Sequence, residues 1–310
     1  MNLCTFVAAM VPHFSVALSC RLVGLPRASF YTWRAQHTGQ AGLEPGQAGC
    51  RASSARARAD DALTARIRAI HQESRGTYGS PRVHAELRGA GVHCGGKRVA
   101  RLMRAAQLVG VQRRRWTPRT TIADPHASAA PDRLARDFTA TAPNQRWASD
   151  ITYVATGEGW LYLAVVLDLF SRKVVGWATA NHLRTELALD ALDLALRTRQ
   201  AHRTAALVFQ SDHGTQYPAT AFRQRLEQVG LVASMGSVGD CFDNAVAESF
   251  FGTLKTELLH RQVWPSHAAA QTAIFRYIYA WYNPRRRHST LGYASPDQFE
   301  YHFHTMTAAA

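Results

Sequence analysis

The sequence predicts an α/β protein in which a mixed β-sheet flanked by helices follows an all-α, strongly basic region. Hydrophobic residues recur at helical spacing up to about residue 108, whereas from Gln145 onward they form β-rich runs. After Gln145 the predicted elements follow the order β-β-β-α-β-α-β-α, which favours a mixed sheet with helices on its faces. With 310 residues, 46% of them hydrophobic, the chain is long enough for two or three packed domains.

Positive charge is concentrated in the helical region. Lys and Arg outnumber Asp and Glu by 36 to 22 in the whole chain, and by sixteen to four between Arg51 and Arg119. This surplus favours a polyanionic partner, either nucleic acid or a membrane surface. No stretch is long and uncharged enough to span a bilayer, and Asp168 interrupts the apolar run LYLAVVLDLF. The expected partner is therefore double-stranded DNA, and no membrane is expected.

Cysteine usage and the N-terminal residues indicate the compartment. The five cysteines are scattered without a CxxC pair, which favours reduced thiols over a disulfide framework or a cysteine zinc cluster. The apolar opening MNLCTFVAAMV has neither a basic leader nor a clear processing site, so a secretory signal is not expected. These features together predict a cytoplasmic protein.

Residues 1–37 contain the first predicted helices. The row SVALSCRLVGLPRASFYTWR predicts two short helices around Gly24, with Pro26 near the start of the second. Both a helix-turn-helix and a plain helical hairpin fit this pattern. Residues 38–59, rich in Gly, Ala, Ser and Arg, are expected to form a linker.

Residues 60–116 are expected to form a basic helical DNA-binding domain, in which Ser80 caps a helix that begins at Pro81. The next helix, KRVARLMRAAQL, is amphipathic: Val99, Leu102 and Met103 fall on one face. The charged side chains proposed to contact DNA are Lys97, Arg98, Arg101 and Arg104. This basic face either meets DNA phosphates or is simply solvated. Residues 117–144, which contain four prolines, are expected to form a connector.

Residues 145–282 are expected to form the sheet domain. The runs RWASDITYV, WLYLAVVLDLF and KVVGWATA predict a three-stranded meander. A helix over residues 185–199, a strand ending at Asp212, a helix over 219–229, the strand LVAS and a long helix over 244–260 follow. A last helix over 267–282 stops at Asn283 and Pro284. Residues 283–310 form a basic C-terminal segment.

Three carboxylates lie where the predicted elements can bring them together. Asp150 is in the first strand, Asp212 ends a later strand, and Glu248 is in the first turns of the long helix. At 4 Å and an effective dielectric of about 20, each pair would repel by about 4 kcal/mol, and a divalent cation removes that conflict. Mg²⁺ prefers such oxygen ligands, and two ions about 3.5–4 Å apart would flank an in-line displacement at phosphorus.

Each acid also has a plainer explanation. In this explanation Asp150 is a charged residue on an edge strand, Asp212 forms a turn, and Glu248 is a solvated residue on a helix. Among the other acids, Asp168 is expected to end a hairpin, and Glu257 lies on the side of the long helix opposite Glu248, since nine residues turn the helix by 900°.

The segments around the three acids, WASDITYV, QSDHGTQY and DNAVAESFFGTLKTEL, resemble those of DDE transposases and retroviral-type integrases. The likeness extends to YGSPRVHAEL in the helical region and to YNPRRRHSTLGYASP near the C-terminus, so it covers nearly the whole chain. The chain is similar in particular to bacterial insertion-sequence transposases whose catalytic part is encoded by a second reading frame.

The resemblance implies an RNase H-like catalytic core, with Asp150, Asp212 and Glu248 as its catalytic and metal-binding triad. It implies two Mg²⁺ ions, for which Mn²⁺ is expected to substitute. The implied reaction is strand cleavage followed by attack of the freed 3′-hydroxyl on a second phosphodiester. Asn244 and Lys255 share the face of Glu248 and are expected to contact DNA. His213 is an auxiliary residue that orients the substrate.

The resemblance also implies partners. These are DNA of the element ends and of the target, further copies of this chain assembled on DNA, and the product of an upstream reading frame. The expected location is the nucleoid of a bacterium. Two rival classes stay open: an RNase H-like nuclease that does not transpose, and a DNA-binding regulator with an inert core. A last cluster either contacts DNA or forms a packed helix end with a solvated loop; its members are Trp281, Tyr282, Arg285, Arg286, Arg287 and His288.

Overall fold

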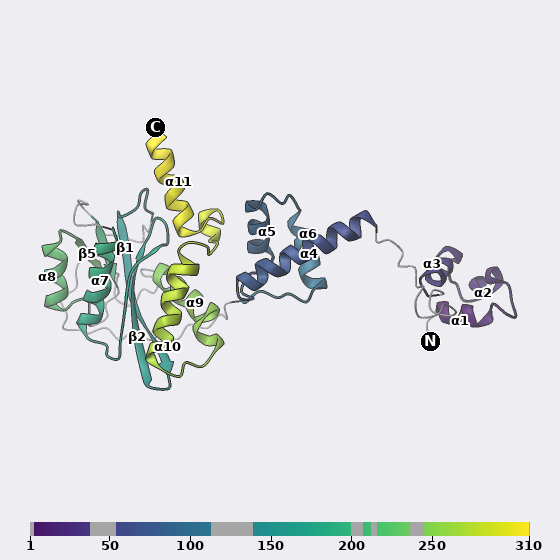
Figure 1. Cartoon of the computed structure of the whole chain (residues 1–310), viewed down its shortest axis with the longest axis horizontal. Helices are drawn as coiled ribbons and strands as arrows, with labels where there is room; N and C mark the ends of the chain where they lie inside the picture. Colours follow the sequence, from purple (N-terminus) through teal and green to yellow (C-terminus); the bar gives the residue numbers. More distant parts are fainter. Residues whose placement is uncertain are drawn as a thin grey trace. The chain divides into compact units, whose positions relative to one another are not determined.

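The computed structural model describes residues 3–37, 54–112, 139–199, 207–211, 216–235 and 245–309. The chain divides into two compact units, Met1–Ala62 and Leu63–Ala310 (Figure 1). Among the helices in the described ranges, none has both the length and the apolar composition that a membrane span requires.

The first unit contains three short helices, α1 (Leu3–Met10), α2 (Val16–Leu22) and α3 (Arg27–His37). Ser15 is the N-cap of α2, and its hydroxyl oxygen accepts a hydrogen bond from the Leu18 N–H at 3.3 Å. Gly24 adopts a left-handed conformation, with φ +65°, in the turn before α3. The two helices predicted around Gly24 are present, and α1 is an additional helix that the sequence did not predict. The buried residues of this unit are Cys4, Val7, Cys20 and Phe30.

The basic helical region consists of α4 (Ala55–Glu73), α5 (Ser80–Gly89) and α6 (Gly96–Ala105). α5 begins earlier than predicted: Gly79 is its N-cap and Ser80 is its first residue. A Cβ added at Gly110 would lie 2.4 Å from the Gly79 backbone nitrogen, so the chain after α6 packs directly against the start of α5. The apolar faces of the three helices meet in one cluster, formed by Leu63, Ile67, Tyr78, Val83, Leu87, Val99, Leu102 and Met103.

The larger unit is built on a five-stranded mixed sheet. Its strands are β1 (Arg146–Thr156), β2 (Gly159–Asp168), β3 (Val174–Ala180), β4 (Val208–Ser211) and β5 (Val232–Met235), in the spatial order β3-β2-β1-β4-β5. β1, β2 and β3 form an antiparallel meander, and β4 and β5 run parallel to β1. The predicted mixed sheet and the predicted order of elements are therefore confirmed.

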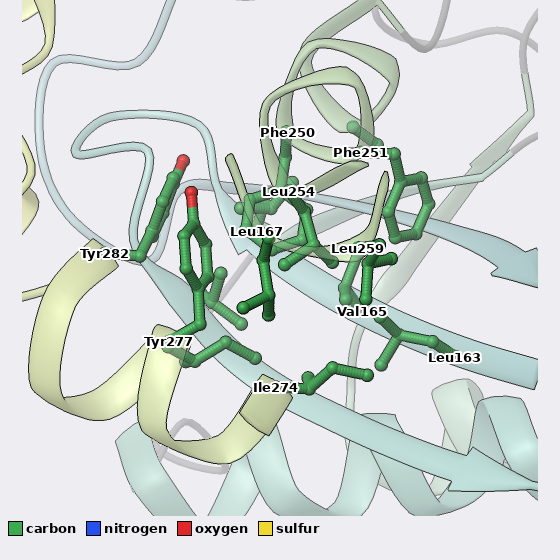
Figure 2. Packing of buried hydrophobic residues seen from close by; sticks show 14 of the residues in the cluster. Leu163, Val165, Leu167, Phe250, Phe251, Leu254, Leu259, Ile274, Tyr277 and Tyr282 are labelled. Carbon is green, nitrogen blue, oxygen red and sulfur yellow. The ribbon is translucent and has the colours of Figure 1, made fainter. Parts of the chain in front are cut away.

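Helices cover both faces of the sheet. α7 (Thr185–Arg199) and α8 (Thr220–Gln228) pack on one face, and α9 (Ala245–Glu257) and α10 (His267–Arg276) on the other. Side chains of a strand alternate between faces, so Leu163, Val165 and Leu167 of β2 point toward α9 (Figure 2). A π-helical turn, Tyr277–Tyr282, continues α10.

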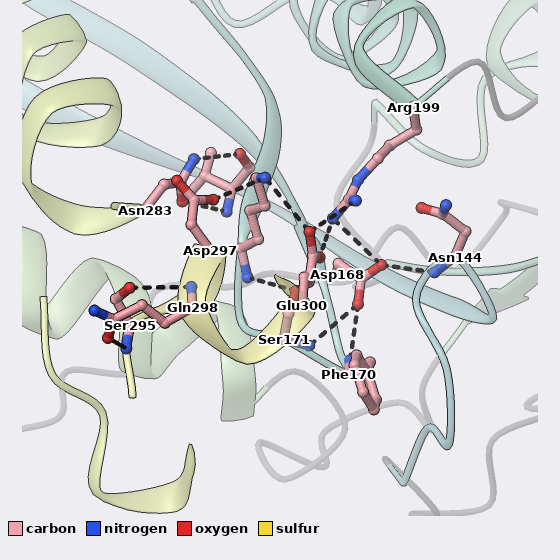
Figure 3. A network of polar contacts seen from close by, with 12 residues as sticks. Asn144, Asp168, Phe170, Ser171, Arg199, Asn283, Ser295, Asp297, Gln298 and Glu300 are labelled. Atoms are coloured by element: carbon pink, nitrogen blue, oxygen red, sulfur yellow. Dashed lines mark hydrogen bonds and ion pairs between the residues drawn. The ribbon is translucent and has the colours of Figure 1, made fainter. Parts of the chain in front are cut away.

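The C-terminal helix α11 (Pro296–Ala309) is held by a buried polar network (Figure 3). Glu300 accepts hydrogen bonds from the Ser171 hydroxyl at 2.6 Å and from Arg199 Nη1 at 3.0 Å. Asp168, which ends β2 as predicted, accepts hydrogen bonds from the backbone N–H groups of Asn144 at 2.7 Å and Phe170 at 2.9 Å. This network joins the β2–β3 turn, α7 and α11.

Candidate functional site

Asp150 lies on β1, in the middle of the sheet. Its explanation as an edge-strand charge is wrong, because β1 is flanked by β2 and β4. Ala148 and Val154 belong to the buried cluster beneath α9, so the alternation of a strand places Asp150 on the same face of the sheet. The described pairing of β1 with β4 runs from Arg146 to Ala148. Asp150 therefore lies two residues beyond the point where the described pairing stops.

Glu248 lies in the first turn of α9 and is exposed. The opposite side of the helix is apolar and buried, and Phe250 and Leu254 pack from it onto β2 (Figure 2). Anchoring of this apolar side leaves the side that carries Glu248 open to solvent. A carboxylate in the first turn is also favoured by the positive end of the helix dipole.

Lys255 is near enough to Asp150 for the two charges to interact. Burial lowers the pKa of the Lys255 ammonium group, and the negative charge of Asp150 acts in the opposite direction. The ammonium nitrogen stands 5.5 Å from the centre of the Tyr153 ring, a cation–π contact. The structure thus brings together two of the predicted site residues, one from β1 and one from α9.

Tyr153 is the neighbour that sequence reasoning missed. Alternation along β1 assigns Tyr153 to the face opposite Asp150, so no local pattern points to it. The ring is 47% exposed and makes an edge contact with Trp160, with ring centres 4.9 Å apart. Tyr153 follows the last residue of β1 that pairs with the described β4.

Asp212, His213 and Asn244 lie outside the described residues. β4 ends at Ser211, immediately before Asp212, and α9 begins at Ala245, immediately after Asn244. Within the described parts of the chain, no three His, Cys, Asp or Glu residues gather closely enough to hold a metal ion.

Two other acids have structural partners. Glu257 is buried at the end of α9, where Arg286 Nη2 donates a hydrogen bond to it at 2.7 Å. Asp168 is fully buried, and burial raises the pKa of its carboxyl group although the Asn144 N–H and Arg199 lower it. The opposite placement of Glu257 and Glu248 on α9 agrees with the helical period.

The cluster after α10 is packed inside the protein rather than presented to solvent. Arg286 is 4% exposed and binds Glu257, and Arg287 forms an ion pair with Glu86 of α5 at 2.8 Å. Burial and three nearby arginines lower the pKa of His288 to about 2, so its ring is neutral. Trp281 stacks at a tilt on Tyr78, with ring centres 5.4 Å apart. The interpretation as a packed helix end therefore holds for these residues, and Arg285 remains exposed.

The amphipathic pattern predicted for α6 is confirmed. Val99, Leu102 and Met103 are buried in the helical cluster. Lys97, Arg101 and Arg104 are exposed, and Arg98 is half-buried. The helix thus presents a basic face while its apolar face holds it to α4 and α5.

Comparison with known families divides the chain in a similar way. The Integrase core domain matches residues 140–241, and a second family of the same description matches residues 229–296. An HTH-like domain matches residues 58–116, the basic helical region, and not residues 1–37. The helix-turn-helix interpretation of residues 1–37 stays a prediction.

Three relatives are similar along most of their length. Transposase InsF for insertion sequence IS3A of Escherichia coli K12 is 36% identical over 95% of this chain and 97% of its own length. The insertion element IS600 uncharacterized 31 kDa protein of Shigella sonnei is 39% identical over 93% of this chain and all of its own length. The transposase for insertion sequence element IS629 of Shigella sonnei is 40% identical over 80% of this chain and 81% of its own. The chain therefore belongs to the insertion-sequence transposases with an RNase H-like integrase core, a family of DDE polynucleotidyl transferases.

Proposed function

We propose that this chain cuts DNA strands at the ends of an insertion sequence and joins the freed 3′-hydroxyls to target DNA, using Asp150, Asp212 and Glu248 as metal ligands. The observation that carries the proposal is the position of Asp150. It lies on the α9 face of the sheet, two residues after the last described pair between β1 and β4, and its charge interacts with that of Lys255.

The register of β1 and β4 supports the inclusion of Asp212. Arg146 pairs with Val208 and Ala148 pairs with Gln210, a constant offset of 62 residues. The same offset relates position 150 to position 212. In parallel neighbouring strands, residues in register point to the same face, so the proposal puts both carboxylates on the side of α9.

The donor set fits a hard divalent cation, because three carboxylates provide only oxygen ligands. When bound, Mg²⁺ or Mn²⁺ would lower the pKa of an attacking water or hydroxyl group and stabilise charge on the departing 3′ oxygen. Lys255 would bind a phosphate of the scissile strand from the same face of the sheet. Asn244 would add a further DNA contact, and His213 would orient the substrate.

The helical region is proposed to hold the element end. Lys97, Arg98, Arg101 and Arg104 of α6 would contact DNA phosphates, and each such contact contributes salt-sensitive affinity through counterion release. We further propose that several copies of the chain assemble on paired DNA ends in the nucleoid, together with an upstream-frame protein.

The test offers a duplex carrying the inverted repeats that bracket the coding region, with a pre-cut 3′-hydroxyl end, to the full chain with target DNA and Mg²⁺. Joined product is expected from the unaltered chain, and neither Asp150→Asn nor Asp212→Asn should form it. Asp190→Asn, an exposed aspartate on α7, is the matched control and should join normally. Hydrolysis without joining would point to the nuclease, and metal-independent binding without chemistry to the regulator.

A further inference from the structure

An open groove of about 730 Å³ lies on the Leu63–Ala310 unit, away from the proposed carboxylate site. Glu257 lines it at the end of α9, nine residues or about 13 Å along the helix from Glu248 and on the opposite side. Three exposed arginines contribute to its walls: Arg75, Arg261 and Arg276.

These arginines come from different parts of the chain. Arg75 follows α4, within the segment that matches the HTH-like domain. Arg261 ends the 3-10 turn Leu259–Arg261, and Arg276 ends α10, both within the segment that matches the Integrase core domain. The groove is therefore built jointly by the helical region and the core.

Three arginine charges line the groove. In the described ranges, no acidic side chain forms an ion pair with Arg75, Arg261 or Arg276. The guanidinium of Arg261 also reaches the turn that follows Arg75, since a Cβ added at Gly76 would lie 3.7 Å from its Nη2 atom. Positive charges that line one groove repel one another, and a bound anion is favoured because it relieves this repulsion.

Glu257 does not serve as that anion. Its two carboxylate oxygens accept hydrogen bonds from Arg286 at 2.7 to 3.1 Å, and the Tyr277 hydroxyl donates to Oε2 at 2.9 Å. The charge of Glu257 is thus balanced by Arg286, a buried residue that does not line the groove.

The part of the groove lining that α10 contributes consists mostly of small side chains. Ala268, Ala269, Thr272 and Ala273 line it from α10. Their spacing of one and four residues puts them along one side of the helix. Small side chains let a ligand approach the helix closely.

We infer that this groove binds the phosphodiester backbone of duplex DNA, as a second contact separate from the carboxylate face. The inference rests on the proposed function only in that DNA is the partner. A polyphosphate matches three guanidiniums spread along a groove, because each can bind one phosphate through its planar donors. The net charge of +14, most of it in the adjoining helical region, favours the same partner over an acidic peptide.

The experiment measures binding of the full chain to a fluorescein-labelled mixed-sequence DNA duplex by anisotropy, over a series of NaCl concentrations. Each substitution Arg75→Gln, Arg261→Gln or Arg276→Gln should make the slope of log K against log salt shallower by about 0.9, and the triple variant by about 2.7. Arg276→Lys should keep most of the slope because it keeps the charge. Arg197→Gln removes an exposed charge from the end of α7 and should leave the slope unchanged.

Four outcomes would overturn the inference. The first is an unchanged salt slope in the triple variant, and the second is an equal decrease of the slope in Arg197→Gln. The third is a triple variant that circular dichroism shows to be unfolded, while the three single variants fold and keep the slope. The fourth is a change in the oligomeric mass of the triple variant without DNA. The last would assign the groove to an acidic surface of a second copy. Asp212→Asn tests the proposed chemistry and should leave the slope unaltered, so the two proposals can fail separately.

Discussion

Arg286 binds both carboxylate oxygens of Glu257, with its Nε atom 3.1 Å from Oε1 and 2.9 Å from Oε2. The side chains are only 5% and 6% exposed. The pair fastens the end of α9 to the turn that follows the π-helical turn Tyr277–Tyr282. A carboxylate and a guanidinium 29 residues apart in the sequence therefore hold in place the helix that carries Glu248.

Glu257→Gln should destabilise the protein by about 3–5 kcal/mol, because it leaves the Arg286 charge buried without a counter-charge. The free energy of unfolding in urea measures this loss. Glu248→Gln is the matched control: the residue is exposed on the same helix, and its variant should unfold with nearly the free energy of the unaltered chain. Equal stability of the two variants would show that the buried pair is dispensable.

Glu300→Gln should destabilise the protein by about 1.5–3 kcal/mol near neutral pH, and the loss should shrink in acid. Burial acts to raise the pKa of Glu300, but hydrogen bonds and charge from Arg199, Ser171 and Lys173 outweigh it and hold the pKa below its ordinary value of 4.5. A carboxyl group whose pKa is lowered by folding stabilises the folded state fully at pH values above its ordinary pKa. This stabilisation is lost as the pH falls through the pKa of the group in the folded protein. Urea unfolding of both proteins at several pH values checks the sign; a difference that grows in acid would refute it.

Asp150→Asn should make the Lys255 amine more reactive toward an acylating reagent at mildly alkaline pH. Burial lowers the pKa of Lys255 and Asp150 raises it, so removal of the aspartate charge lowers the pKa further and increases the neutral, nucleophilic fraction. Competitive labelling followed by mass spectrometry reports the rate at each lysine. Lys97 on α6 is the internal reference and should react equally in both proteins. An unchanged or slower rate at Lys255 would mean that the two groups do not sense each other.

Lys97→Gln combined with Arg104→Gln should make the salt dependence of DNA binding shallower by about 1.8, since each removes one phosphate contact. Both side chains are exposed, so the thermal midpoint should stay nearly constant. The measurement is the anisotropy titration in increasing NaCl, with the charge-matched pair of exposed residues Arg197→Gln and Arg184→Gln as control. A slope equal to that of the control would show that the basic face of α6 is solvated and does not contact DNA.

The fold was predictable where local pattern decides it. The apolar runs of the meander and the amphipathic spacing of α6 both reappear, because alternation and the helical period fix which side chains are buried. α1 was missed, since its eight residues are apolar on most sides and carry no capping signal. α5 begins one residue earlier than predicted, because the Gly79 carbonyl accepts the hydrogen bond from the Val83 N–H.

The elements that carry Asp150 and Glu248 were predictable, whereas the surroundings of these two acids were not. Asp150 in a strand follows from the residues around it, but its position beside the last pair of β1 with β4 depends on strand order. The roles of Arg286 and Arg287 could not be read from a basic turn, because their partners Glu257 and Glu86 lie far away in the chain. Long-range pairing, rather than composition, determines which arginines remain available for DNA.

Localised cleavage of the polypeptide by bound Fe²⁺ with ascorbate gives the sharpest test of whether the three carboxylates gather around a divalent ion. Radicals formed at the ion cut the backbone within a few ångströms, and mass spectrometry identifies the fragments. Cuts should occur near residues 150, 212 and 248 together, should be suppressed by excess Mg²⁺, and should vanish in Asp150→Asn. Cuts confined to one of these positions, or unchanged in that variant, would contradict a shared metal site.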